Sequence, residues 1–273
     1  VAHMPAIGLA PLIALLLQQP VTAPAPESEP QSISDNSFLI EEAYNQDRGV
    51  VQHISLFTRE WRSGAYLYSF TQEWPVDAAP AHQLSYTIQV PSNGDGAGFG
   101  DLWFNWRYQS VSRDRLAIAP RVSVSAPTGD PSRGLGAGGV GVQAALPVSV
   151  RAGDRFVLHS NLSGTIVPHG RDETGDRAAT GAILVGQSLV WLTSPRFNVF
   201  CEALVNRESS VTGPGTTAWD TTIVIDPAVR WAYNFHSGLQ IVPGIGFPIT
   251  LNGGPDERWS VLGYLSFEHP FRH

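Results

Sequence analysis

The chain is predicted to be all-β, an antiparallel transmembrane β-barrel of about twelve strands in the bacterial outer membrane. Three observations predict this class. Apolar and polar residues alternate with period two, long and short turn-rich connections alternate along the chain, and only 15% of the 273 residues are charged. Globular proteins carry about 25% charged residues, so much of this surface is expected to face something other than water.

The alternation is clearest between Asp101 and Gln109. Phe104 and Trp106 fall on one face of this segment, whereas Asn105 and Arg107 fall on the other. Successive strand side chains point to opposite faces, so one face is apolar and the other polar. A soluble β-sandwich also alternates, but it buries its apolar face, whereas a membrane barrel turns that face to lipid. We favour the barrel and keep the sandwich as the alternative.

Segments with this alternation are about ten residues long or slightly longer, the length of a tilted barrel strand. We predict strands near 50–59, 64–75, 82–91, 99–110, 115–127, 139–151, 155–166, 179–192, 196–207, 220–234, 238–250 and 258–269. Long connections are expected near 91–98, 128–138, 167–178 and 208–219, and short ones near 110–115, 151–155, 192–196 and 234–238. Extracellular loops and periplasmic turns of a barrel alternate in the same way.

Aromatic residues and the last strand support a membrane barrel. Tryptophans gather near predicted strand ends, where interfacial girdles lie: Trp61, Trp74, Trp191, Trp231 and Trp259. The chain finishes in an alternating aromatic strand with Phe267 and Phe271. Such a strand is expected to engage the barrel-assembly machinery.

The N-terminal part is predicted to lie outside the barrel fold. Met4 to Leu17 is an apolar stretch of signal-peptide length, so residues 1–25 are expected to be a signal peptide. Residues 26–49 are a linker, and residues 50–273 are the barrel. Within the linker, Phe38 to Gln46 has the spacing of a short amphipathic helix. This segment either plugs the lumen or lies in the periplasm.

Composition excludes several classes of function. The net charge is −7, every basic residue is arginine, and no basic patch occurs, so nucleic-acid binding is not expected. The single cysteine, Cys201, cannot form an internal disulfide, and the histidines lack metal-ligand spacing. We expect neither a cofactor nor a bound metal.

Charged and aromatic residues on the polar strand faces are candidates for the lumen. An arginine facing lipid at mid-depth costs about 2–4 kcal/mol, so such residues should point inward. The lumen-lining candidates are Asp101, Trp103, Arg107, Arg121, Glu202, Asp226 and Arg230. They either line a pore and set its selectivity, or pair with one another and fill a narrow barrel.

A barrel-borne lipid hydrolase or lipid-modifying enzyme is the alternative function. His53 and Ser55 share one strand face, and His159 and Asn161 share another. A hydrolase would need these groups within hydrogen-bond reach, and the predicted strand order keeps the two strands apart. We therefore expect a protein that is not an enzyme, with a non-conducting structural barrel as a third possibility.

Two glycine-aspartate blocks carry a resemblance to a known family. Residues 98–108, GFGDLWFNWRY, and residues 119–130, APRVSVSAPTGD, followed by GLGAG at 134–138, resemble blocks of the outer-membrane barrels named for the MetA pathway of phenol degradation. Residues 37–46 are also similar to segments of such proteins. The resemblance implies an outer-membrane channel or transporter, with a link to the uptake of aromatic or other hydrophobic compounds. We expect a monomer embedded in outer-membrane lipid that passes small solutes.

Overall fold

The computed structural model describes residues 33, 35–92, 96–254 and 257–271. The predicted signal peptide, residues 1–25, lies outside the described residues, as does the first part of the linker. Among the described residues, no helix is long and apolar enough to cross a membrane.

The described chain consists almost entirely of strands, with one short 3₁₀ helix, η1 (Pro131–Arg133). The strands are β1 (Val50–Glu60), β2 (Tyr66–Pro75), β3 (His82–Ser92), β4 (Leu102–Tyr108), β5 (Val111–Arg113), β6 (Leu116–Ile118), β7 (Arg121–Ala126), β8 (Gly141–Ala152), β9 (Phe156–Arg171), β10 (Arg177–Ser194), β11 (Phe197–Gly213), β12 (Thr216–Trp231), β13 (Tyr233–Asn234), β14 (Gln240–Gly246), β15 (Ile249–Thr250) and β16 (Ser260–Pro270).

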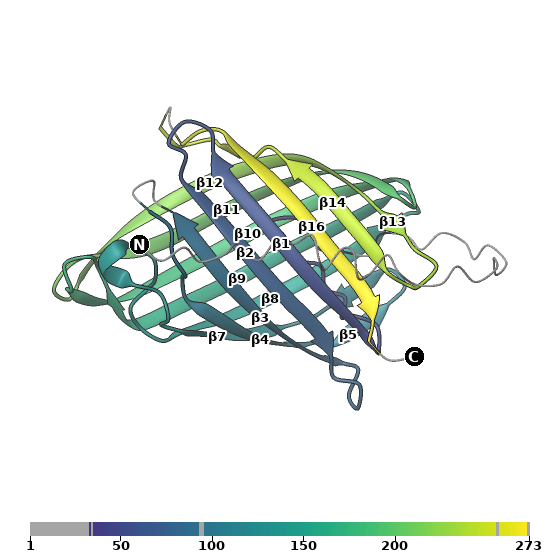
Figure 1. Cartoon of the computed structure of the whole chain (residues 1–273), viewed down its shortest axis with the longest axis horizontal. Helices are drawn as coiled ribbons and strands as arrows, with labels where there is room; N and C mark the ends of the chain where they lie inside the picture. Colours follow the sequence, from purple (N-terminus) through teal and green to yellow (C-terminus); the bar gives the residue numbers. More distant parts are fainter. Residues whose placement is uncertain (1–32, 34, 93–95, 255–256, 272–273) are drawn as a thin grey trace, which may run out of the picture. The chain divides into compact units, whose positions relative to one another are not determined.

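These segments form one closed antiparallel barrel of 12 strands (Figure 1). Neighbours in sequence pair along the sheet, β16 pairs with β1, and β14 pairs with both β16 and β12 to close the ring. Several barrel strands are interrupted, which gives more segments than strands. β6 and β7 both pair with β8 across Pro120, and β14 and β15 both pair with β12 across Pro248. Proline lacks the amide hydrogen that a ladder needs. The predicted fold class is confirmed.

Strand length varies more around the barrel than the sequence predicted. β9 to β12 have 16, 18, 17 and 16 residues, whereas β4 and β14 have 7 each. In Figure 1 the long strands reach furthest to the left. Most of the loops expected at 167–178 and 208–219 are therefore strand, and that prediction was wrong. Their threonine, serine and glycine residues continue the ladder instead of breaking it.

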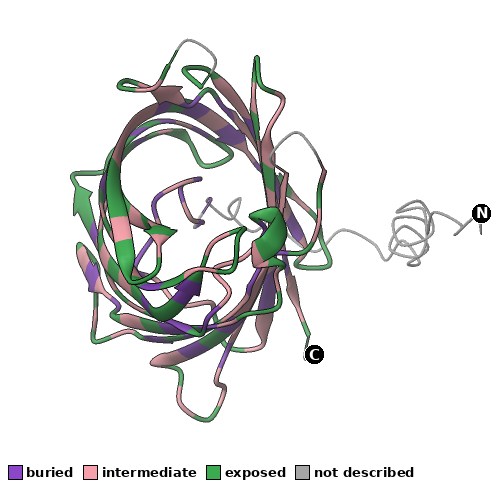
Figure 2. Ribbon diagram, turned by 90° about the vertical axis from the view of Figure 1, so that its left-hand side faces the viewer, coloured by how far each residue is buried: buried purple, intermediate pink, exposed green. Residues whose placement is uncertain are grey.

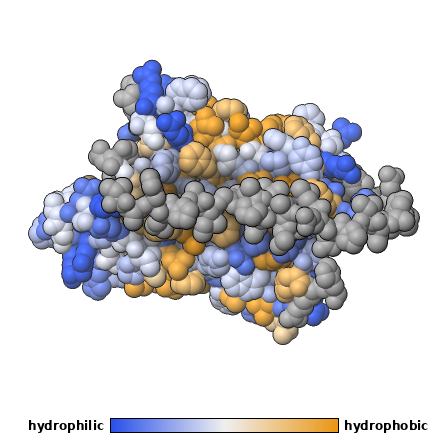
Figure 3. Space-filling model, viewed as in Figure 1, coloured by the Kyte–Doolittle hydropathy of each residue, from blue (hydrophilic) through white to orange (hydrophobic). Residues whose placement is uncertain are grey.

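The barrel wall is apolar outside and polar inside. On β4, Phe104 and Trp106 are 54% and 44% exposed, whereas Arg107 is 3% exposed. A soluble sandwich would show the reverse exposure. Figure 3 shows apolar residues over the middle of the molecule and hydrophilic residues at its two ends. This distribution suits a wall that faces hydrocarbon between two aqueous layers.

Replacing an outward-facing residue near mid-wall with arginine should destabilise the barrel in a bilayer. Leu162 is 53% exposed and follows Asn161, whose side chain points inward. Leu162→Arg should lower the free energy of unfolding by about 2–4 kcal/mol, whereas Thr217→Arg, at an outward-facing position near the end of β12, should cost about 1 kcal/mol or less. Urea unfolding in phospholipid vesicles measures both. Equal costs at the two positions would contradict the proposed depth of the wall.

Candidate functional site

A segment before the first strand crosses the interior of the barrel. Residues 35–47, with Ile33, form what we call the plug segment; Figure 2 looks into the barrel and shows buried chain inside the ring of strands. Ile40 and Ala43 are 1% and 0% exposed. The segment contacts opposite walls, because Ser37 hydrogen-bonds Ser188 of β10 and Glu41 pairs with Arg107 of β4. The sequence left open whether this segment enters the lumen; in the structure, its described residues lie inside the barrel.

Glu202 on β11 holds the first bend of the plug segment. Its carboxylate accepts hydrogen bonds from the backbone amides of Phe38, Leu39 and Ile40, at 3.1, 3.0 and 2.8 Å. These amides would otherwise need carbonyl partners within a helix. The amphipathic helix expected over Phe38 to Gln46 is absent, and that prediction was wrong. The buried carboxylate and the bent backbone satisfy each other.

Two arginines on the opposite wall bind the next part of the segment. Glu41 lies 3.2 Å from Arg107 Nη2 and 2.7 Å from Arg121 Nη1. Arg107 also donates to the carbonyl oxygen of Tyr44 at 3.1 Å. Burial alone would raise the pKa of Glu41, but Arg121 and Arg107 lower it below its usual value. Glu41 is therefore ionised at neutral pH and remains paired with both arginines.

Arg230 on β12 fixes the start of the segment. Its guanidinium donates to the carbonyl oxygen of Asp35 at 2.7 Å, to that of Asn36, and to Asn198 Oδ1 at 3.2 Å. The Asp35 carboxylate in turn accepts from Tyr264 at 2.6 Å and from Gln52 at 2.7 Å. The segment is thus held by charge-assisted hydrogen bonds at three points along its length.

One aromatic contact adds apolar packing to these polar anchors. The Phe38 ring lies between Phe200 and Tyr264, with ring centroids 4.8 and 4.7 Å away. The wall beside this ring has no side chain at Gly244, where an added Cβ would clash with Phe38 at 2.4 Å. Likewise, a Cβ at Gly186 would lie 2.2 Å from Ile40. Glycine at both positions lets the segment lie directly against the strands.

The predicted lumen residues fall into two groups in the structure. Arg107, Arg121, Glu202 and Arg230 come together around the plug segment, and no pattern in the sequence indicates that they share a partner. Asp226 is fully buried and lies across from Glu202 in the β11–β12 register.

Asp101 and Trp103 lie elsewhere. Trp103 is half-buried and pairs in the ladder with Thr87 and Ser125, away from these anchors. The Asp101 carboxylate accepts from the amides of Gly129 and Ala137 at 3.0 and 2.8 Å. It therefore ties the first glycine-aspartate block to the loop formed by the second.

Several plug contacts were missed at the sequence level. Asn161 on β9 binds the backbone of Glu41 through both its oxygen and its nitrogen, and Ser149 on β8 accepts the amide of Ala43. Their positions on polar strand faces marked them only as inward-facing. The paired glutamates Glu41 and Glu42, placed just before the barrel, were the available signal for a segment that could pair with lumen arginines.

The residues proposed for a hydrolase do not assemble a catalytic triad. His53 lies 3.3 Å from His269, and Ser55 hydrogen-bonds Tyr68, all on the outer face of the wall. His159 binds Ser149 at 2.7 Å rather than Asn161, and Ser149 is fully buried. Among the described residues, no group of three histidine, cysteine or acidic side chains could hold a metal ion.

No protein-family model matches the chain, and no curated protein sequence matches it. Solved structures do. The COG4313 outer membrane channel from Pseudomonas putida F1 superposes with a TM-score of 0.54 at 10% identity, over 83% of this chain and 97% of that one. The NanC porin superposes with a TM-score of 0.53 at 9% identity, over 80% and 98% of the two chains. At these identities the likeness concerns the fold, and the chain has the fold of bacterial outer-membrane channels.

Proposed function

We propose that this protein is an outer-membrane channel for small solutes whose lumen is closed by its own plug segment. The observation that carries the proposal is the way the segment is held. Most of its anchors are charged or polar side chains of the wall, and they bind the backbone and carboxylates of the segment. Polar contacts of this kind can be exchanged for water or solute, whereas a continuous apolar core cannot.

The solutes are proposed to be small and to include hydrophobic or aromatic compounds. The two glycine-aspartate blocks support membership of the MetA-pathway barrels, because Asp101 and Gly129 join them into one unit at the loop end. Aromatic side chains also lie inside the lumen, where Phe38 contacts Phe200 and Tyr264. An aromatic solute could exchange contacts with these rings as the segment moves.

The non-conducting barrel and the hydrolase are less well supported. The plug segment fits a closed channel that can open, and the buried Ser149 has no access for a lipid substrate. In a barrel that never conducts, the plug segment would stay bound even after an anchoring contact is removed. Single-channel recording of a variant without such a contact separates that case.

Removing the charge of Glu41 should favour the open channel. Glu41→Gln loses its ion pairs with Arg107 and Arg121, and a loss of about 1–2 kcal/mol in the closed state multiplies the open fraction by about 5–30. Single-channel recording of refolded protein in planar bilayers measures the open fraction. Glu257→Gln, in an exposed loop, is the matched control and should behave as the wild type.

Absence of current from inserted wild-type and Glu41→Gln protein alike would contradict the channel and favour a structural barrel. Opening in the control to the same extent would show that the Glu41 contacts are not the anchor.

Aromatic solutes should pass the channel faster than sugars of similar size. Liposomes that contain the Glu41→Gln protein are expected to swell faster in benzyl alcohol derivatives or benzoate than in a pentose, after subtraction of the rate in protein-free liposomes. The lumen aromatics supply the preference, so Phe200→Leu should reduce it while leaving the pentose rate unchanged. Equal rates for both solute classes would limit the proposal to a non-selective channel.

A further inference from the structure

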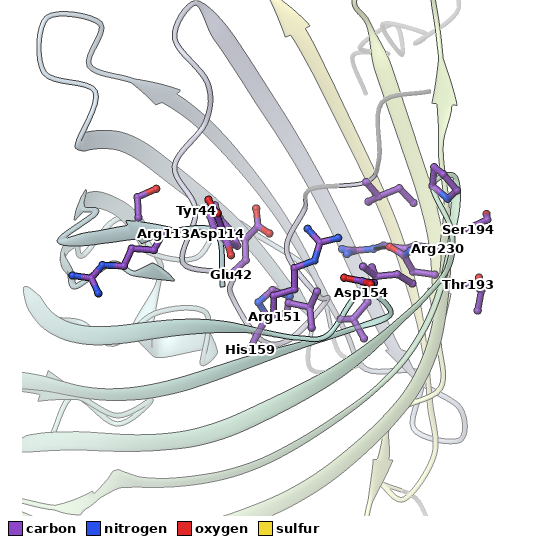
Figure 4. A pocket seen from close by; sticks show the side chains of 17 residues that line it. Glu42, Tyr44, Arg113, Asp114, Arg151, Asp154, His159, Thr193, Ser194 and Arg230 are labelled. Atoms are coloured by element: carbon purple, nitrogen blue, oxygen red, sulfur yellow. Dashed lines mark hydrogen bonds between the residues drawn. The ribbon is translucent and has the colours of Figure 1, made fainter. Parts of the chain in front are cut away.

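A cavity of about 670 Å³ lies beside the plug segment, at the end of the barrel where the short turns are (Figure 4). Its walls come from β8 to β12, from the turn after β5 and from the plug segment itself. Binding sites for small molecules span about 300–1,000 Å³, so the cavity has the size of a ligand site. Two of its lining residues, Glu42 and Arg151, have side chains that take no part in anchoring the plug segment.

Glu42 supplies an unpaired carboxyl group to this cavity. It is 6% exposed, and its neighbour Glu41 takes the arginine partners of the segment. Within the described residues, the Glu42 carboxylate has neither a hydrogen bond nor an ion pair. Burial, followed by repulsion from Asp35, raises the pKa of Glu42. A cationic group in the cavity would offset the cost of ionising it.

Arg151 at the end of β8 supplies the complementary positive charge. Figure 4 shows the Arg151 and Glu42 side chains directed into the same space. No ion pair joins the two, and no other described side chain pairs with the Arg151 guanidinium. By contrast, Arg230 and His159, which also line the cavity, are bound to the plug segment and to Ser149. The exposed residues Arg113, Asp114 and Asp154 also line the cavity. Glu42 is the buried carboxyl group of the lining, and the Arg151 guanidinium is directed into the same space.

One part of the cavity wall is an apolar surface. Ile33, Val157, Val190 and Leu192 border the cavity and belong to the apolar cluster around Phe38. A bare inorganic ion would gain nothing from this surface, and a purely apolar solute would leave both charges unpaired. A ligand with two opposite charges and an apolar group would satisfy all three features.

We propose that this cavity binds a zwitterionic solute with an apolar side chain, such as a free aromatic amino acid. The ammonium group would pair with Glu42, the carboxylate with Arg151, and the side chain would lie on the apolar surface. This inference rests on the proposed function, because it makes the cavity a solute subsite at the inner end of the channel. It narrows the solute class from aromatic compounds in general to those that carry both charges.

The test is calorimetric titration of the refolded full chain in detergent with L-phenylalanine, phenylethylamine and 3-phenylpropionate. Phenylalanine should bind at least about tenfold more tightly than either single-charge analogue, because each analogue leaves one of the two groups, Glu42 or Arg151, without a charged partner. Glu42→Gln and Arg151→Gln should each weaken phenylalanine binding by at least about tenfold. Glu257→Gln and Arg155→Gln, both at exposed positions outside the cavity, should leave it unchanged.

Equal binding of all three compounds, or phenylalanine binding that both cavity variants retain, would overturn the proposal. The comparison of analogues uses only the wild-type chain, so it decides the question even if a variant fails to fold. Single-channel recording of the wild type and of the Glu41→Gln variant separates the two proposals. Current without phenylalanine binding keeps the channel and removes the zwitterion site, and binding without current keeps the site and removes the channel.

Discussion

The carboxylate of Glu202, buried in the barrel wall and bonded to three consecutive amides, is the contact on which the interior depends. A buried carboxyl group in the lumen wall needs hydrogen-bond donors, and a bent backbone in the lumen needs acceptors for its amides. The amides of the segment donate to the Glu202 carboxyl oxygens, so both groups have their hydrogen-bond partners. With the first bend fixed, Glu41 meets Arg107 and Arg121 further along the segment, and Phe38 meets its two aromatic neighbours.

The same contacts are compatible with the proposed channel. Buried ion pairs give specific geometry but modest net stability, because desolvation offsets much of their attraction. The segment is therefore placed accurately without being held as firmly as a packed core. Glu42, within the segment, and Arg151 of β8 both line a cavity that the plug segment helps to form. Solute binding there and movement of the segment would be coupled, since a ligand shifts the equilibrium toward the state that it prefers.

The opposite end of the barrel is organised by backbone contacts rather than by charge pairs. Asp101 accepts two amides of the loop between β7 and β8, and Asp130 caps η1 through the amide of Ser132. A Cβ at Gly136 would lie 2.6 Å from Asp101 Oδ1, so the glycines of the second block leave room for the aspartate of the first. The two glycine-aspartate blocks thus form one loop-anchoring unit.

The sequence by itself determined the architecture and the inward or outward direction of most side chains. Period-two alternation is a local property, so Phe104 and Arg107 could be assigned to opposite faces without knowledge of any partner. Strand length was harder to predict, because serine, threonine and glycine serve equally in turns and in strands beyond the apolar wall. The site required the tertiary structure. Phe38 and Glu202 are 164 positions apart, and only closure of the barrel brings them together. Polar lumen positions look alike in sequence, and which of them bind the plug segment is decided by its path across the interior.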